Sequence, residues 1–106
     1  MRKYEFFVYI LTDIRHDRLY VGITNNLERR VWEHNQINPG RYTTRYKVHK
    51  LVYYEVFKYV DKAIGREKKL KKWKRQWKLD LINRANPSWQ ALHIPHQTRS
   101  LLTPRT

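Results

Sequence analysis

Two short runs of aromatic and β-branched residues, separated by a polar segment, constrain the fold more than any other feature. Tyr4–Leu11 and Leu19–Ile23 each have the composition of a strand, and residues 12–18 between them are polar and turn-like. The short connection predicts that the two strands pair as an antiparallel hairpin. Leu51–Phe57 alternates as a strand does and is expected to become the third strand of the same sheet.

Two helices are expected to flank this sheet, which gives an α+β fold. Asn25 and Glu28 resemble a capping pair ahead of a short amphipathic helix that ends near Pro39. Asp61–Ile82 is the strongest helical segment and is predicted to form one continuous helix. The inward positions are Leu27, Val31 and His34 in the first helix, and Ala63, Leu70, Trp77 and Leu81 in the second.

The charge is strongly positive, with 23 Lys and Arg residues against 9 Asp and Glu and a net charge of +14. Such an excess repels itself in a compact fold and usually persists because a polyanion offsets it. Nucleic acid is the commonest such partner. A membrane surface is disfavoured because no helix-length stretch pairs a basic face with a wide apolar one. The residues expected to follow a phosphate backbone are Arg41, Arg45, Lys68, Lys69, Lys71, Lys72 and Arg75.

Several classes of protein are excluded or disfavoured by what the sequence lacks. The chain has no cysteine, which excludes disulfides, cysteine-type zinc sites and thiol catalysis. No stretch reaches membrane-spanning length and the apolar run near the N-terminus is interrupted by Glu5, so a cytoplasmic location is expected. Residues 1–92 are expected to form one domain, and residues 93–106 a basic, loosely ordered tail.

Glu67 is the most informative side chain in the sequence. It lies between Ala63 and Leu70, beside the apolar stripe of its helix, so its carboxylate is expected to be partly desolvated and to need a partner. Mg²⁺ or Mn²⁺ is an apt partner because these ions accept one carboxylate together with waters and a substrate phosphate. The alternative is an ion pair with Lys71 or Lys74, which is common on helices.

Arg30 and His34 form a second candidate cluster, one helical turn apart and on the inward side, whereas Arg29 points toward solvent. An inward Arg can clamp a phosphate, and a neighbouring His can transfer protons. The alternative is that Arg30 lies at the helix edge and that a backbone carbonyl satisfies His34.

Tyr9 and Tyr20 lie on the two strands of the predicted hairpin and form the third cluster. They are either ordinary buried tyrosines or a pair of phenols that orient or deprotonate a water and bind a developing phosphorane oxygen. Gly22 either permits a close approach of backbone or phosphate, or marks the turn at the strand end.

Taken in order along the chain, these residues resemble the motifs of the GIY-YIG endonuclease superfamily. The resemblance is closest to its small stand-alone members, which are similar to the N-terminal catalytic module of bacterial excision-repair nucleases, and it extends roughly from Tyr4 to Trp89. The first motif has Phe7 and Val8 in place of Gly and Ile, but the chemistry needs the phenol that follows them. The matching segments are Val8-Tyr9-Ile10, Tyr20-Val21-Gly22, Leu27-Glu28-Arg29-Arg30 with His34, and Arg66-Glu67-Lys68.

The resemblance implies a small three-stranded antiparallel sheet flanked by helices, with one metal ion. It implies that Tyr9 is the general base or water-orienting phenol and that Tyr20 is its counterpart. Arg30 is similar to the phosphate-stabilising Arg of the family, and His34 to the His near the nucleophile. Glu67 matches the metal-binding carboxylate. Asn86 fits the Asn that the family often carries near the end of this region, with Asn83 as its rival.

The predicted function is therefore a metal-dependent endonuclease that cleaves DNA with one Mg²⁺ or Mn²⁺ ion, RNA not being excluded. The rival prediction is a catalytically silent nucleic-acid-binding module, and a third is a basic structural protein of a ribonucleoprotein assembly. A protein partner or a dimer is compatible with the small size of the domain, although no residue pattern supports either. Metal-dependent cleavage distinguishes the enzyme from both rivals.

Overall fold

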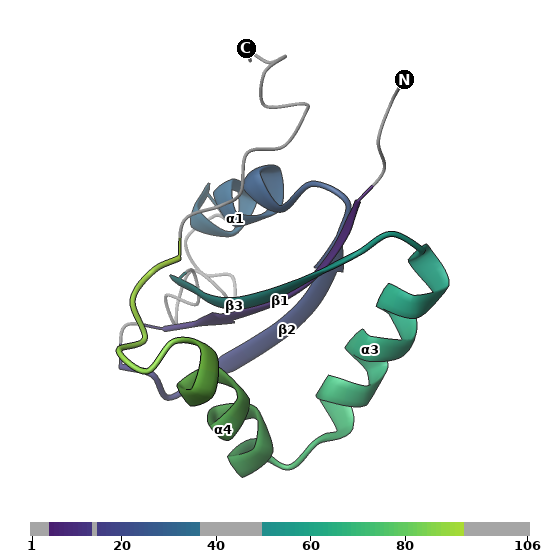
Figure 1. The fold of residues 1–106 in the computed structure, drawn as a ribbon. Coiled ribbons are helices and arrows are strands. Elements are labelled where there is room, and N and C mark those ends of the chain that lie inside the picture. The colour runs from purple at the N-terminus through teal and green to yellow at the C-terminus, as the bar shows by residue number, and fades with distance from the viewer. Residues whose placement is uncertain (1–4, 14, 37–49, 93–106) are drawn as a thin grey trace.

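The computed structural model describes residues 5–13, 15–36 and 50–92, with the backbone alone at 34–36. The predicted tail, the loop residues Arg41 and Arg45, and the His34 side chain lie outside the described residues. The chain has an α+β fold with a three-stranded antiparallel sheet in the order β2-β1-β3 (Figure 1). The elements are β1 (Phe6–Thr12), β2 (Leu19–Thr24), α1 (Leu27–Gln36), β3 (Lys50–Phe57), α3 (Val60–Lys72) and α4 (Arg75–Ala85).

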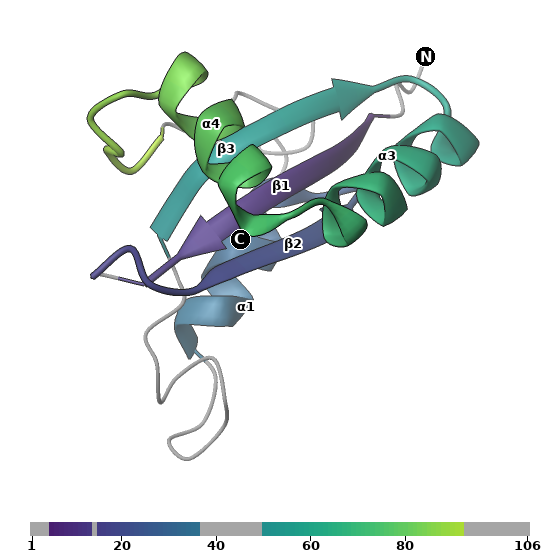
Figure 2. The same ribbon diagram turned by 90° about the horizontal axis from the view of Figure 1, so that it is seen from below.

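Helices cover both faces of the sheet: α1 lies on one face, and α3 and α4 lie on the other (Figures 1 and 2). The central strand β1 is consequently buried on both sides, which explains its uninterrupted apolar composition. Its side chains alternate between two cores. Phe7, Tyr9 and Leu11 pack with Leu27 of α1. Val8 and Ile10 pack with Ala63, Leu70 and Ile82 of α3 and α4.

The predicted hairpin of β1 and β2 is confirmed, and its connection is fixed by polar contacts. The hydroxyl of Thr12 donates to the carbonyl of Arg18 at 2.8 Å. Asp13 Oδ1 accepts the backbone N–H groups of Asp17 at 2.7 Å and of Arg18 at 3.3 Å. Burial alone would raise the pKa of Asp13, but these N–H donors outweigh burial and hold that pKa below its ordinary value. These contacts hold the register in which Tyr9 lies opposite Gly22.

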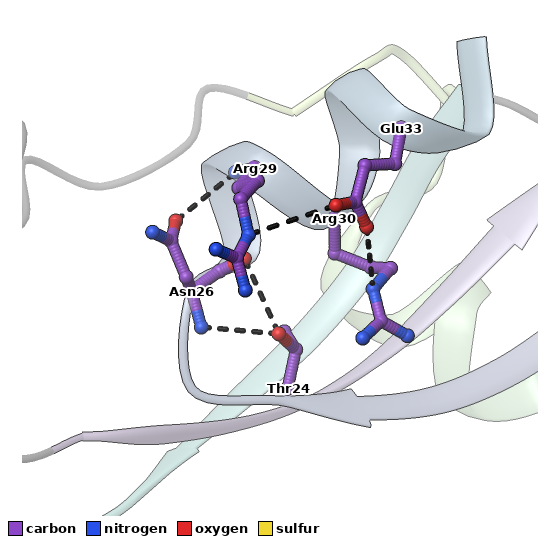
Figure 3. Close-up of polar contacts among 5 residues, drawn as sticks. All are labelled: Thr24, Asn26, Arg29, Arg30 and Glu33. Carbon is purple, nitrogen blue, oxygen red and sulfur yellow. Dashed lines mark hydrogen bonds and ion pairs between the residues drawn. The ribbon is translucent and has the colours of Figure 1, made fainter. Parts of the chain in front are cut away.

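Helix α1 begins one residue later than the predicted capping pair. The cap is Asn26 rather than Asn25: its Oδ1 accepts the N–H of Arg29 at 3.0 Å, and its carbonyl accepts the N–H of Arg30 at 3.0 Å (Figure 3). Thr24, the last residue of β2, accepts the N–H of Asn26 through its hydroxyl at 3.0 Å. This bond fixes the turn between β2 and α1 so that the second asparagine, not the first, reaches the cap position.

The prediction of one continuous helix over Asp61–Ile82 was wrong, because the chain breaks into α3 and α4 at Trp73 and Lys74. Both residues are extended, with ψ 149°. An unbroken helix of this length would run for about 33 Å, beyond strands that span about 25 Å. The break turns the chain back, so that Ile82 is fully buried in the core, whereas Trp77, predicted to face inward, is 49% exposed.

Within these described ranges, no helix combines the length and the apolar character needed to cross a bilayer.

Candidate active site

The two phenols that the sequence singled out lie side by side on the α1 face of the sheet. Tyr9 is fully buried at the middle of β1, and Tyr20 is half-buried on β2. Their ring centroids are 6.2 Å apart, with the ring planes inclined at 38°. The hairpin brings them together because Tyr9 lies opposite Gly22. Tyr20 is two residues from Gly22 on β2 and therefore points to the same face of the sheet.

Gly22 makes the room that the Tyr9 ring occupies. The two residues are opposite each other in the hairpin. A Cβ atom added at Gly22 would lie 2.5 Å from Cζ and 3.0 Å from Cε1 of Tyr9, where ordinary contact begins near 3.4 Å. The structure thus shows a close approach at this glycine, and the group that approaches is the phenol of Tyr9. The approach of a backbone or phosphate stays a prediction.

The electrostatic environment keeps the Tyr9 phenol protonated at neutral pH. Burial, reinforced by the neighbouring Tyr20 phenol, raises the pKa of Tyr9 well above its ordinary value of 10.0, and the guanidinium of Arg30 offsets part of that rise. A protonated phenol donates one hydrogen bond and accepts another. Tyr9 is therefore suited to orienting a water or a phosphate oxygen.

Arg30 comes from α1, and its side chain extends toward the sheet, as Figure 3 shows. Its Nε atom lies 3.3 Å from Oε1 of Glu33, and its side chain is 38% exposed. Arg29, by contrast, is 64% exposed and contacts Glu33 at 3.7 Å. The predicted inward placement of Arg30 and outward placement of Arg29 are both confirmed. His34 is on the same helix, and its role stays a prediction.

Glu67 lies on the buried side of α3, with 13% of its side chain exposed, as its place beside the apolar stripe predicts. Its Oε2 atom lies 2.6 Å from Nζ of Lys71. The ion pair foreseen as the alternative to a metal is thus present, and Lys71 rather than Lys74 is the partner. Helix α3 packs on the face of the sheet opposite α1, whereas Tyr9 and Tyr20 belong to the core on the α1 face (Figure 1).

The donor chemistry of Glu67 fits a hard divalent ion, which accepts a single carboxylate when waters and a phosphate complete the coordination. Among the described residues, no group of three or more His, Cys, Asp or Glu side chains gathers at one point. Among these residues, an ion at Glu67 would take most of its ligands from waters or a substrate phosphate, and the ammonium of Lys71 would have to leave the carboxylate.

A network that the sequence did not indicate joins α3 to β3. Arg66 binds Glu55 with two hydrogen bonds, Nε to Oε1 and Nη2 to Oε2, both 2.9 Å long. The hydroxyl of Tyr53 donates to the same carboxylate, and the Arg66 guanidinium lies 5.2 Å from the ring centroid of Trp73. Because Arg66 directly precedes Glu67, this clamp fixes which side of α3 faces the sheet.

The same network perturbs two titrating groups. Burial alone would raise the pKa of Glu55, but the hydrogen bonds from Arg66 and Tyr53 outweigh it and hold that pKa below its ordinary value. Burial and the bond to Glu55 raise the pKa of Tyr53 to about 12. The carboxylate is therefore ionised and the phenol neutral across the physiological range of pH.

Asn86, expected near the active site, is buried at the end of α4 and is occupied by backbone contacts. Its Nδ2 donates to the carbonyls of Val52 at 3.1 Å and Gln90 at 2.9 Å, and its Oδ1 accepts the N–H of Gln90 at 3.3 Å. Asn83 accepts a hydrogen bond from the indole of Trp89. Asn86 therefore fastens the segment after α4 to β3, and Asn83 fastens that segment to α4.

The basic residues predicted for α3 are all exposed, as is the first residue of α4. The sequence from position 68 to position 79 contains no carboxylate, so this stretch of the chain is uniformly cationic. The exposed basic residues are Lys68, Lys69, Lys71, Lys72 and Arg75.

The chain is similar in sequence to known proteins. Residues 5–80 match the family model described as the GIY-YIG catalytic domain. A UPF0213 protein of Clostridium perfringens is 43% identical over 77 residues, which cover 73% of this chain and 82% of that protein. A UPF0213 protein of Syntrophus aciditrophicus is 39% identical over 82 residues, covering 76% and 92%.

A solved structure has the same fold. The solution NMR structure of a UPF0213 protein from Bacillus halodurans superimposes with a TM-score of 0.54 at 22% sequence identity. The match covers 89% of this chain and 99% of that one. It supports the three-stranded sheet and its flanking helices as an arrangement shared with this small protein.

Proposed function

Since this chain belongs to the GIY-YIG nuclease family, we propose that it is a metal-dependent endonuclease that hydrolyses phosphodiester bonds in DNA. The observation that carries the proposal is the buried Tyr9 phenol, seated over Gly22 and flanked by Tyr20 and Arg30. Packing alone does not need a hydroxyl at this position, and this hydroxyl lies beside a second phenol and a guanidinium.

Tyr9 acts as a hydrogen-bonding group that orients the attacking water. Its raised pKa argues against a standing phenolate, so the phenol of Tyr9 does not remove the proton by itself at neutral pH. The ring is buried against Gly22 and cannot turn away, so a water that its hydroxyl binds starts close to the attacking geometry. Tyr20, less buried on the edge strand, contributes the second phenol.

Arg30 stabilises the charge that develops on the phosphate. A guanidinium donates two parallel hydrogen bonds to phosphate oxygens, and Glu33 holds Arg30 at its Nε atom. In the reaction, a P–O bond forms to the water as the bond to the leaving sugar oxygen breaks. The water loses one proton and the leaving oxygen gains one. The imidazole of His34 has the proton affinity for such a transfer.

Glu67 is the residue that would hold the divalent ion. When bound, Mg²⁺ or Mn²⁺ supplies Lewis-acid stabilisation of the phosphate oxygens and lowers the pKa of a bound water. The exposed lysines of α3 attract the backbone without reading bases, so they contribute affinity rather than sequence preference.

The experiment that tests the proposal is cleavage of end-labelled DNA with and without Mg²⁺ or Mn²⁺. We expect cutting with either ion, loss of cutting in Glu67→Ala and retention of DNA binding in that variant. Asp61→Asn removes an exposed carboxylate from the same helix and serves as the matched control. Binding that needs no metal and never leads to cutting would instead support the silent binding module.

A further inference from the structure

A tryptophan in the first turn of α4 is half-exposed, although tryptophan usually buries most of its large apolar surface. Trp77 is 49% exposed. Its ring stands at 86° to that of Trp73, with the centroids 5.9 Å apart, and the ammonium of Lys74 lies 5.7 Å from its centroid. The Trp77 ring thus contacts the Trp73 ring and lies near the Lys74 ammonium, and about half of its surface remains exposed to solvent.

The support under Trp77 is rigid. Trp73 is partly buried against the core beneath α3 and α4. It also carries the guanidinium of Arg66, which two hydrogen bonds hold to Glu55. Trp77 packs against this fixed ring. It therefore loses less conformational entropy when a ligand stacks on it, and more of the contact energy remains as affinity.

The charge around Trp77 selects a polyanion. Residues 68–79 hold seven Lys or Arg side chains and no Asp or Glu. A protein partner with an apolar surface would leave these cations unpaired, whereas a nucleic acid supplies a phosphate for each of them. An exposed aromatic ring among cations is also the feature on which unpaired bases stack.

We propose that Trp77 and Lys74 form a stacking platform for an unpaired base, so that the protein engages a single-stranded segment of its DNA. The inference rests on the proposed function, because the strand that it binds is part of the nuclease substrate. Bases within a duplex are already stacked on each other and present only their edges, so a duplex gains nothing from an exposed indole.

The position of the platform favours a flexible strand. Helices α3 and α4 lie on the face of the sheet opposite α1, from which Arg30 extends (Figures 1 and 2). A duplex has a persistence length of about 50 nm and does not wrap round one small sheet without a large bending cost. A single strand can follow the surface from one face to the other.

The test is the affinity of Trp77→Ala for fluorescently labelled oligonucleotides, measured by anisotropy in EDTA so that no cleavage occurs. The probes are a single strand, the same strand with abasic sites along its length, and the duplex. Loss of one stacked base should weaken binding to the single strand by about 5- to 150-fold. Binding to the abasic strand and to the duplex should change less than twofold, and Trp77→Phe should restore most of the affinity.

Trp32→Ala is the matched control, since Trp32 is 61% exposed on α1. Lys74→Gln should lower the salt slope for the single strand by about 0.7, whereas Trp77→Ala leaves that slope unchanged. Equal losses on all three probes, or an equal loss in Trp32→Ala, would overturn the proposal. Loss of binding to anionic vesicles with unchanged binding to DNA would overturn it in favour of a membrane surface.

Cleavage and single-strand binding can be measured separately in the same Trp77→Ala variant. If the Trp77→Ala variant cuts DNA with metal and binds the single strand with wild-type affinity, the stacking platform is rejected and the proposed nuclease activity stands. If the wild-type protein binds the single strand tightly through Trp77 but cuts DNA with no metal ion, the nuclease activity is rejected and the stacking platform stands.

Discussion

Gly22→Ala is the substitution whose effect follows most directly from the geometry of the site. The added Cβ would lie 2.5 Å from Cζ of Tyr9, so the ring must move by about 1 Å to reach ordinary contact. Tyr9 is fully buried and its neighbours are packed on both sides of β1. Overpacking of this kind costs about 1–3 kcal/mol, and the alanine returns about 0.5–1 kcal/mol by restricting the unfolded chain.

We therefore expect Gly22→Ala to lower the free energy of unfolding by about 1 kcal/mol, within a range of about 0 to 2.5 kcal/mol. Urea denaturation followed by circular dichroism measures this difference. The same substitution in a Tyr9→Leu background should be neutral or slightly stabilising, because the clashing ring is gone. The two backgrounds thus differ by a coupling energy of about 1–3 kcal/mol.

Gly65→Ala is the matched control, because a Cβ added at this exposed position of α3 meets nothing within 4 Å. It should stabilise the protein by about 0.8–1 kcal/mol through helix propensity alone. The reasoning fails if Gly22→Ala destabilises the Tyr9→Leu background as much as the wild type. Gly22 would then be required by the conformation of its own backbone and not by the space that the Tyr9 phenol occupies.

Three further perturbations have defined outcomes. Lys71→Met removes the ammonium that competes for Glu67, so calorimetric titration should show Mg²⁺ binding about two- to fivefold more tightly; weaker binding would mean that Lys71 helps to build the site. Glu55→Gln should destabilise the fold by about 1–3 kcal/mol at neutral pH. The pKa of Glu55 is lower in the folded protein than its unfolded value of 4.5, so the stability difference is fully present above pH 4.5 and is lost as the pH falls through the folded pKa. The denaturation curves of the two proteins should therefore converge in acid. Arg30→Lys keeps the charge but loses the forked donor, so cleavage should slow by about 10- to 100-fold with little change in stability; an equal loss of thermal stability would assign Arg30 to the fold.

The strands and the phenol pair could be predicted because local composition determines them. A strand buried on both faces requires an apolar run such as β1, and a short polar connection requires a hairpin. Once Tyr9 and Gly22 are opposite each other, Tyr20 must share the face of Tyr9. The inward side of α1, with Arg30 on it, follows from helical spacing in the same way.

The break between α3 and α4 could not be predicted, because it depends on the dimensions of the sheet. No proline or glycine marks Trp73 or Lys74, and the apolar period continues through them. The break also explains the choice of partner for Glu67. Lys71 remains one turn away on α3, whereas Lys74 is displaced from the helix by its extended backbone.

The clamp of Arg66 on Glu55 was invisible in the sequence for a related reason. The two residues are 11 positions apart, on a strand and a helix whose relative placement no local pattern specifies. The start of α1 depended in the same way on a tertiary detail. Two adjacent asparagines have the same capping propensity, and only the hydroxyl of Thr24 distinguishes Asn26 from its neighbour.

Single-turnover cleavage by Tyr9→Phe tests the central claim most directly, because the substitution removes one oxygen atom and leaves the ring over Gly22. The account predicts that the cleavage rate falls at least about 100-fold while the affinity for DNA stays within twofold and the fold remains intact. A Tyr9→Phe variant that cuts at the wild-type rate would show that the buried phenol takes no part in the chemistry.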